Sequence, residues 1–467
     1  MIRFFSKQKK ERKINLEEKF PWLESLEKRK LAQKKETFSC RLKYFNELNS
    51  FVDTDEWHIL ATKFKNALIG SGYPKYAADL EFELLSDLFN KDTINSIFSN
   101  PSNSFHKSIK AGNFEDEIEI HKNFKVTRSP KGLILIVGSS NTILPIILAI
   151  ILSYLCGNIT VVQLSNLHKK IIPNFFDKLP HFKKNCIYFT NLNQAEDNDR
   201  ECLSQLISEV KWDIINVWGG EDANDFYYTN SRNNKYRPKV LNMEPLTGIV
   251  LIQAEHIKAN QKILTKELAE AISTMGQQLC SSPTEGYIIG DLAEPLREAF
   301  FLELIDKLDE TYNLQSSSEA NTIKLDRVLS QAVDTGAKVY TSQKHGNHIS
   351  VINSDNQSFF FKITSELNLS IHNRNNFLEL INIDSFENAY ENILQINSKA
   401  THEEIKKVQT VLVFGNDDFW KDSINLARTI GAYRTINLNY VLKRHPLEAL
   451  DGMHLVEEFS YPIAILN

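Results

Sequence analysis

The sequence predicts an α/β fold built from two parallel-sheet domains, with N-terminal helices and a C-terminal arm. Four short apolar runs alternate with helical stretches over residues 133–217, and a second alternation begins near residue 246. Alternation of this kind forms βαβ units, whose strands pair in parallel. The chain has 467 residues, of which 42% are hydrophobic and 24% charged, so it is long enough for two or three domains with cores of their own.

The N-terminal part of the chain predicts an arm followed by helices. Residues 1–40 are rich in Lys, Arg and Glu. We interpret them as a basic arm, either a solvated helix or a flexible segment, with binding of a partner as the alternative. From Cys40 to Phe98, apolar residues recur every three to four positions, which is typical of amphipathic helices. A loop is predicted over Ser96–Ser104, where Asn100-Pro-Ser-Asn103 interrupts the pattern.

Residues 41–245 are assigned to a helical lead-in and a dinucleotide-binding α/β domain. The predicted strands are Leu133–Val137, Ile159–Val162, Cys186–Phe189 and Ile214–Val217, and the helices between them are Ile143–Cys156, Leu167–Leu179 and Glu196–Val210. Polar turns follow the first and fourth strands, at Gly138–Thr142 and Trp218–Asp222. Ligands of such sheets bind beyond the carboxyl ends of the strands, where free N–H groups at helix starts attract phosphate. Neither turn matches GxGxxG or a Walker A motif, so simple tight turns are the alternative.

Residues 246–425 are assigned to a second α/β domain, and residues 426–467 to a bridging C-terminal segment. The domain opens with a strand at Gly248–Ile252, a helix at Leu264–Met275 and a strand at Tyr287–Ile289. Later helices are predicted at Leu292–Leu308 and Lys324–Ala337, and later strands at Val339–Tyr340, Ile349–Ile352, Phe359–Ile363, Leu378–Ile383 and Thr410–Phe414.

Cys280 lies on the connection between the helix and the strand that follows it. A thiol on such a loop is a candidate nucleophile. The alternative is a buried, inert cysteine that acts as a small hydrophobic residue. The polar neighbours of Cys280 argue against that alternative; they are Gln277, Gln278, Ser281 and Ser282.

The segment Gln278-x-Cys280-Ser281-Ser282-Pro283 resembles the active-site segment of the LuxC family, acyl-CoA reductases that form a branch of the aldehyde dehydrogenases. Similar stretches follow the family order over about residues 125–460: Trp218-Gly-Gly-Glu221, Pro238-Lys-Val240, Gly431–Ile436 and Asp451-Gly452. The resemblance implies an aldehyde dehydrogenase-like fold. It also implies reduction of an acyl-CoA or acyl-carrier thioester, expected to be fatty acyl, to an aldehyde. NADPH is the expected cofactor, with NADH as the alternative.

The resemblance also implies roles for individual residues. Cys280 would carry the acyl group and Asn141 would bind the oxyanion. The expected cofactor-binding residues are Ser139, Ser140, Gln163, Trp218, Gly219, Gly220 and Glu221. Gln163 stands where the family usually has a Lys that reaches the adenosine ribose or its phosphate, so weaker NADPH preference is expected.

Three further residues are interpreted as structural. Glu244 lies near the position of the general base of water-using aldehyde dehydrogenases, but Pro245 follows it and the expected glycines do not. A missing base favours reduction over hydrolysis, because water competes for the acyl group. Arg434 and Asp451 are far from Cys280 in sequence, and no second motif connects them to it.

Bulk properties exclude several functions. The net charge of −5 gives no electrostatic basis for binding nucleic acid. Five scattered cysteines indicate a reducing cytoplasm, and neither CxxC nor HExxH occurs, so no metal is expected. The apolar stretch Leu133–Cys156 is interrupted by Gly138–Thr142 and Pro145, which argues against a membrane span.

The family implies a homo-oligomer and an acyl-transferring partner protein. The alternative functions are a non-catalytic dehydrogenase-like scaffold or acyl carrier in a larger complex, and a water-using aldehyde dehydrogenase.

Overall fold

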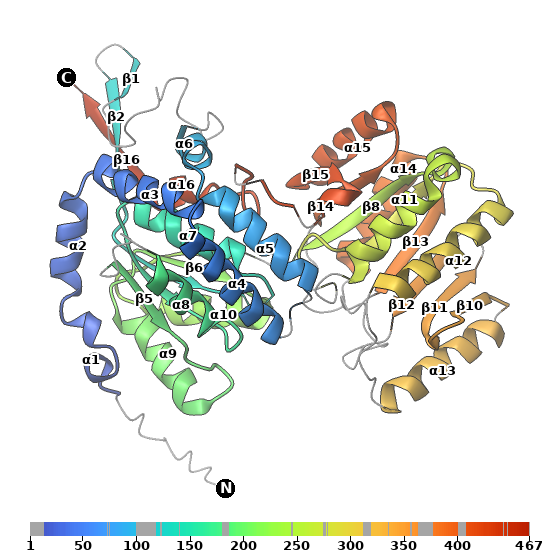
Figure 1. Cartoon of the computed structure of the whole chain (residues 1–467), viewed down its shortest axis with the longest axis horizontal. Coiled ribbons are helices and arrows are strands. Elements are labelled where there is room, and N and C mark those ends of the chain that lie inside the picture. Colours follow the sequence, from blue (N-terminus) through green and yellow to red (C-terminus); the bar gives the residue numbers. More distant parts are fainter. Residues whose placement is uncertain are drawn as a thin grey trace, which may run out of the picture. The chain divides into compact units, whose positions relative to one another are not determined.

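The computed structural model describes residues 14–71, 73, 75–99, 118–121, 124–139, 141–179, 186–243, 246–273, 277, 279–311, 319–334, 336–354, 357–362, 377–399, 408–441, 443–445 and 447–466. The chain divides into two compact units (Figure 1). Unit 1 comprises Met1–Leu60, Phe89–Met243 and Leu455–Asn467, and unit 2 comprises Ala61–Leu88 and Glu244–His454. Each unit contains a sheet with helices on its faces, which confirms the predicted α/β class.

Residues 16–99 are mainly helical, as predicted for Cys40–Phe98. Its elements are α1 (Leu16–Lys19), η1 (Pro21–Leu23), α2 (Leu26–Lys35), α3 (Phe38–Val52), α4 (Asp55–Gly70), α5 (Lys75–Leu88) and α6 (Lys91–Ser99). The loop predicted from Ser96 is wrong at its start, because α6 continues to Ser99. The described part of the arm is not simply solvated: Leu16, Phe20 and Leu26 are buried in the core of unit 1.

The main sheet of unit 1 is parallel, with strand order β5-β4-β3-β6-β7. Its strands are β3 (Leu133–Val137), β4 (Ile159–Gln163), β5 (Ile187–Thr190), β6 (Ile214–Trp218) and β7 (Lys239–Met243). Its helices are α7 (Leu144–Leu155), α8 (Ile171–Lys178), α9 (Asp197–Glu209) and α10 (Glu221–Arg232). Every residue of β3, β4 and β6 is buried, which explains why these strands appear as apolar runs in the sequence.

The order of this sheet reverses between β3 and β6. The chain runs from β3 outwards to β4 and β5, then returns to place β6 on the other side of β3. Val137 at the end of β3 pairs with Val217 of β6, so the two strands end side by side. Such a reversal leaves a crevice at the carboxyl ends of the strands, where open α/β sheets bind their ligands.

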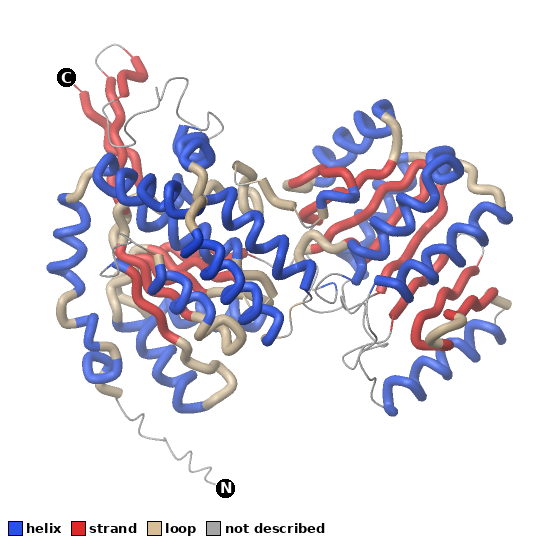
Figure 2. Tube along the Cα trace, viewed as in Figure 1, coloured by secondary structure: helices blue, strands red, loops and turns tan. Residues whose placement is uncertain are grey.

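Unit 1 also contains a three-stranded antiparallel sheet that the sequence patterns do not predict. It consists of β1 (Ile118–His121), β2 (Phe124–Pro130) and β16 (Ser460–Leu466), with β2 in the centre. Figure 2 shows these strands in red, extending from the rest of the unit. The short helix α16 (Leu455–Glu458) leads into β16, and Arg128 Nη1 donates to Ser460 Oγ at 2.8 Å.

Unit 2 has an eight-stranded sheet with the order β10-β11-β12-β13-β9-β8-β14-β15. Its strands are β8 (Thr247–Gln253), β9 (Pro283–Ile289), β10 (Lys338–Ser342), β11 (Gly346–Ser354), β12 (Gln357–Lys362), β13 (Phe377–Ile383), β14 (Val408–Phe414) and β15 (Arg434–Asn437). Its helices are α11 (Ala254–Ser273), α12 (Glu294–Thr311), α13 (Glu319–Asp334), α14 (Phe386–Lys399), α15 (Asp417–Ile430) and η4 (Leu438–Tyr440). The strands from β13 to β15 are parallel, as predicted, and β10, β11 and β12 extend the sheet with antiparallel pairs.

Both faces of the parallel part are covered. Ile249 and Leu251 of β8 pack with α14 and α15, while Val250 and Ile252 pack with α11 and α12. Successive strand residues point to opposite faces, so a strand covered on both sides must be apolar throughout.

Among the residues that the structure describes, no helix is long and apolar enough to cross a membrane. The suspect stretch Leu133–Cys156 is β3, a turn and the buried helix α7.

Candidate active site

Cys280 lies on a tight turn between α11 and β9. The strand begins at Pro283, four residues earlier than predicted, so only two residues separate Cys280 from it. The turn is closed by hydrogen bonds, since Ser282 N donates to Leu279 O at 3.0 Å and Gln277 Nε2 donates to Pro283 O at 2.6 Å. Gln277 has a positive φ of 64°, a backbone conformation that L-residues adopt rarely. Cys280 is therefore held at a defined position and stays half-buried. The predicted neighbour Gln278 lies outside the described residues.

The turn rests directly on the backbone of β8. Gly248 N donates to Ser282 O at 3.1 Å. A Cβ at Gly248 would lie 2.2 Å from Ser281 O and 3.0 Å from the carbonyl carbon of Ser282. Glycine is the one residue type that permits this approach, so Gly248 fixes the height of the Cys280 turn above the sheet.

One side chain that contacts the Cys280 sulfur comes from β14. Gln409 Nε2 lies 3.0 Å from Cys280 Sγ, and the same nitrogen donates to Asp451 Oδ1. Thr410 Oγ1 donates to Gln409 Oε1 at 3.0 Å. Gln409 is not among the residues predicted from the sequence. The available signal was a polar residue at the start of the otherwise apolar run Val408–Phe414, and by itself it does not indicate a site.

A charged cluster surrounds Asp451. Its carboxylate lies 3.8 Å from Arg444 Nη2, and Glu448 Oε2 lies 2.7 Å from Arg434 Nε and 3.7 Å from Arg444 Nε. Burial raises the pKa of Asp451, against the opposing effect of Arg444. Burial lowers the pKa of Arg434, while Glu448 and the Cys280 sulfur oppose that change. Arg434 and Asp451, interpreted from sequence as structural, thus belong to the surroundings of Cys280.

Asp451 reaches this place from a two-residue turn. Asp451 and Gly452 have φ values of 49° and 78°, and Leu450 and Met453 exchange two backbone hydrogen bonds of 2.9 Å. This is the φ pattern of a type I′ turn, which favours Asp-Gly. The Asp-Gly pair that the sequence analysis noted is therefore required by the backbone.

The turns predicted to bind a cofactor lie at the reversal of the unit 1 sheet. Ser139 and Asn141 follow β3, and Trp218, Gly219, Gly220 and Glu221 follow or flank β6. Gly220 is the N-cap of α10, with no atom within 4 Å of a Cβ placed there, while a Cβ at Gly219 would lie 2.9 Å from Ala223 Cβ. Adjacent strands and helix starts of this kind can hold a pyrophosphate. Ser140 lies outside the described residues.

Two residues beside these turns are buried. Gln163 ends β4; its Nε2 donates to Leu192 O at 2.7 Å and its Oε1 accepts from Thr190 Oγ1 at 3.3 Å. Contact with a ribose would require exchange of these bonds. Burial lowers the pKa of His168 to about 4, and a hydrogen bond to the Ser139 backbone opposes this shift.

Two further sequence candidates are Asn141 and Glu244. Asn141 belongs to unit 1 and Cys280 to unit 2. Glu244 lies outside the described residues. Within the described part of the chain, no group of three or more His, Cys, Asp or Glu side chains could hold a metal ion.

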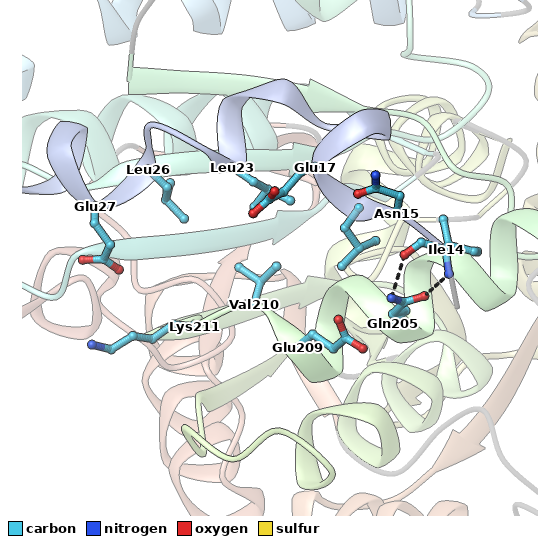
Figure 3. A pocket seen from close by; sticks show the side chains of 11 residues that line it. Ile14, Asn15, Glu17, Leu23, Leu26, Glu27, Gln205, Glu209, Val210 and Lys211 are labelled. Atoms are coloured by element: carbon cyan, nitrogen blue, oxygen red, sulfur yellow. Dashed lines mark hydrogen bonds between the residues drawn. The ribbon is translucent and has the colours of Figure 1, made fainter. Parts of the chain in front are cut away.

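A separate hollow of about 560 Å³ lies in unit 1 between the N-terminal arm and α9 (Figure 3). At one end of it, Gln205 exchanges two hydrogen bonds with the backbone of Ile14, of 2.9 and 3.0 Å. Its lining includes Val210 and Lys211, which precede β6, so it lies at the opposite end of that strand from the cofactor turns.

Comparisons with known proteins agree with this description. The family profile "Acyl-CoA reductase (LuxC)" matches residues 85–461. No curated protein matches the sequence.

Solved structures of similar fold include three dehydrogenases. An NAD-dependent benzaldehyde dehydrogenase from Corynebacterium glutamicum is 14% identical, with a TM-score of 0.64 over 97% of this chain and 91% of that one. A salicylaldehyde dehydrogenase from Pseudomonas putida G7 is 14% identical, with a TM-score of 0.66 over 97% and 90%. The glyceraldehyde-3-phosphate dehydrogenase GapN from Methanocaldococcus jannaschii, complexed with NADP, is 16% identical, with a TM-score of 0.63 over 98% and 96%. At such low identity the likeness establishes the aldehyde dehydrogenase fold alone.

Proposed function

This chain belongs to the LuxC family of acyl-CoA reductases, which makes it an enzyme that reduces an acyl thioester to an aldehyde, and from this premise we propose that Cys280 carries the acyl group. The observation that supports Cys280 is its setting. Cys156, Cys186 and Cys202 are buried, whereas Cys280 is half-buried on a closed turn with an N–H donor 3.0 Å from its sulfur.

In the proposed mechanism the Cys280 thiolate attacks the acyl carbonyl and the carrier thiol leaves as a thiolate. The acyl group then stays on Cys280 as a thioester. A nicotinamide cofactor held by the turns after β3 and β6 would supply the hydride that reduces this thioester. The carbon–sulfur bond breaks, the aldehyde leaves and the electron pair returns to the Cys280 sulfur. Asn141 and the backbone N–H of Cys280 would stabilise the oxyanion at both carbonyl additions.

The cofactor is proposed to bind at the turns after β3 and β6, through Ser139, Ser140 and Trp218–Glu221. Their place at the reversal of the sheet supports this assignment, because the two strands end side by side and Gly220 leaves open space at a helix start. NADPH is the proposed cofactor, with NADH as the alternative, and a fatty acyl thioester is the proposed substrate.

Labelling of Cys280 tests the central assignment. The protein is mixed with acyl-CoA in the absence of nicotinamide cofactor, and its intact mass is measured before and after hydroxylamine. We expect a hydroxylamine-labile acyl adduct that Cys280→Ala abolishes. The matched control is Cys40→Ala, because Cys40 is the other half-buried thiol. An adduct of equal extent in Cys280→Ala would refute the assignment.

The acyl-enzyme should also outlast hydrolysis when cofactor is absent, because the sequence has no convincing general base. Release of labelled fatty acid measures its lifetime. Rapid release that Glu244→Gln abolishes would instead support a water-using dehydrogenase. If no acyl donor labelled the wild type, the non-catalytic scaffold would gain support.

A reducing, cytoplasmic location is proposed because all five cysteines are free thiols. A homo-oligomer and an acyl-transferring partner protein are proposed from the family resemblance. Light scattering, and copurification of the tagged full chain, test these two proposals.

A further inference from the structure

We propose that Gln409 is a positioning residue for Cys280: its carboxamide orients the sulfur for acyl transfer and stabilises the negative charge that the sulfur carries. The proposal rests on the assignment of Cys280 as the acyl-carrying nucleophile. It goes beyond that assignment by giving a role to a residue of β14, 129 positions further along the chain.

The surroundings of Gln409 fix which end of its amide meets the sulfur. Nε2 faces two acceptors, Cys280 Sγ at 3.0 Å and the Asp451 carboxylate, and it has one hydrogen for each. Oε1 accepts from the Thr410 hydroxyl at 3.0 Å. A reversed amide would place its oxygen against the carboxylate and the thiolate, where like charges repel. Asp451 and Thr410 therefore hold the N–H group towards Cys280.

The backbone supplies a second, independent observation. In the pairing of β14 with β8, Val408 lies opposite Thr247 and Thr410 lies opposite Gly248, which leaves Gln409 as the extra residue of a β-bulge. Bulges turn a side chain out of the normal alternation and are common beside active sites. On the other edge of β14, Tyr433 N donates to Gln409 O at 3.0 Å, so the bulge is held in place.

Gly248 of β8 contacts both the bulge at Gln409 and the turn that carries Cys280. The residue that faces the bulge is the one that supports the Cys280 turn through Ser282. A single position in β8 thus sets the height of both the sulfur and the amide that contacts it. The Cys280 turn and β14 are distant in sequence, and their common neighbour β8 fixes their positions relative to each other.

The sulfur carries negative charge at two stages of the reaction. The first is the thiolate before attack, and the second is the thiolate that leaves when the carbon–sulfur bond breaks to release the aldehyde. The nearby guanidinium groups of Arg434 and Arg444 and the carboxylates of Glu448 and Asp451 have formal charges that cancel. The N–H of Gln409 makes a directed contact to the sulfur at 3.0 Å, and hydrogen bonds to charged groups are stronger than those between neutral groups.

The test measures the pH dependence of Cys280 alkylation by iodoacetamide, followed by intact mass, with Cys280→Ala as background. Gln409→Leu removes the donor, and Gln409→Glu keeps the size but places a carboxyl group beside the sulfur. In Gln409→Leu we expect the alkylation midpoint to rise by about one to two pH units and kcat to fall roughly tenfold to a hundredfold. KM for acyl-CoA should change by less than about threefold, because binding is not the step affected. Gln409→Glu should raise the midpoint further.

Two controls separate this role from a loss of packing. Gln205→Leu makes the same chemical change at a partly buried residue that also forms two hydrogen bonds, in unit 1, and should leave the midpoint unchanged. Thr410→Val removes only the anchor of Gln409 Oε1, and should give a smaller shift in the same direction. If Gln409→Leu does not fold, the Gln409→Glu and Thr410→Val pair decides the question.

The outcomes distinguish the proposed role of Gln409 from the assignment of Cys280 as nucleophile, on which it rests. An unchanged midpoint in the folded Gln409 or Thr410 variants, with kcat falling only as far as thermal stability does, would make Gln409 merely structural. Retention of acylation and aldehyde formation in Cys280→Ala would overturn the proposed nucleophile, whatever the Gln409 variants show. A shifted midpoint together with an inactive Cys280→Ala would support both.

Discussion

Ser281 and Val441 are joined by a buried hydrogen bond of 3.2 Å, in which the serine hydroxyl donates to the backbone carbonyl. The bond ties the Cys280 turn to the segment that follows β15, across 160 residues of sequence. The same segment leads to Arg444, Glu448 and Asp451. The position of Cys280 therefore depends on how the segment after β15 packs against the Cys280 turn.

Ser281→Ala should lower the free energy of unfolding by about 1–2 kcal/mol, because it leaves the buried Val441 carbonyl without its donor. Chemical denaturation measures the loss, and the rate of acyl labelling should fall with it. Ser86→Ala in α5 is the control. It removes a hydroxyl bonded within its own helix, to Phe82 O at 3.0 Å, and should cost less than about 0.5 kcal/mol. If both variants lost the same free energy of unfolding, the Ser281–Val441 bond would contribute no more than a hydrogen bond within a helix.

Gly248→Ala should disturb the candidate active site. Its Cβ would meet Ser281 O at 2.2 Å, so the Cys280 turn must move. A displacement of this size is expected to reduce kcat by about a hundredfold and stability by about 1–3 kcal/mol. Gly70→Ala, where a Cβ meets nothing within 4 Å, is the matched control. Wild-type activity in Gly248→Ala would contradict the tight contact.

Asn141→Ala should reduce aldehyde formation by about two to three powers of ten with little effect on folding, because it removes one proposed donor to the oxyanion. Steady-state kinetics and thermal unfolding on the same preparations give both quantities. A rate loss that parallels a loss of stability would indicate a structural role in the turn after β3.

Gln163→Lys should raise kcat/KM for NADPH relative to NADH by close to tenfold, since a charge-assisted contact exceeds a neutral one by roughly 1 kcal/mol. It should also cost about 1–3 kcal/mol of stability, because a lysine cannot accept the Thr190 hydroxyl. Gln163→Leu should show the stability loss without the gain in selectivity. If Gln163→Lys leaves cofactor selectivity unchanged, Gln163 does not face the ribose.

His168 should make stability depend on pH. Its pKa is held by burial at about 4 in the folded chain, against an ordinary value of 6.5. Between these values the unfolded chain binds the proton and the folded chain does not, so stability is full near pH 7 and falls as the pH drops. The loss should reach about 2 kcal/mol at pH 5. His168→Gln should remove that part of the pH dependence, as measured by urea unfolding. If wild type and His168→Gln gave identical pH profiles, His168 would not be the cause.

The sequence predicted most of the parallel sheets because their strands are buried on both faces. Leu133–Val137 is apolar at every position, and its bounds agree with β3 in full. β2 was not predicted, because it is not apolar at every position. Phe124–Pro130 carries Lys125, Thr127 and Arg128 among its apolar residues, and its partner β16 lies more than 300 residues away. Hydrophobic periodicity within a short stretch of sequence cannot predict a pairing between strands so far apart.

Within the candidate site, the sequence indicates only those residues at which chemistry and turn geometry coincide. Cys280 stands out among polar residues on a loop, and the two glycine-containing turns stand out after strands. Gln409 and Asp451 do not, because their contact depends on a bulge and a two-residue turn that bring them together in space. Distance along the sequence gave no sign that Asp451 lies near Cys280, because Gln409 of β14 connects the two through hydrogen bonds.

The pairing of β16 with β2 has a consequence for biosynthesis. Arg128 and Ser460 are 332 residues apart, so at translation rates of ~5–20 residues per second β2 leaves the ribosome roughly 20 to 60 seconds before its partner. During that interval one edge of β2 offers unpaired backbone groups to other chains. A nascent chain stalled within unit 2 would be exposed to aggregation at this edge, and a chaperone that shields extended segments would have its natural target there.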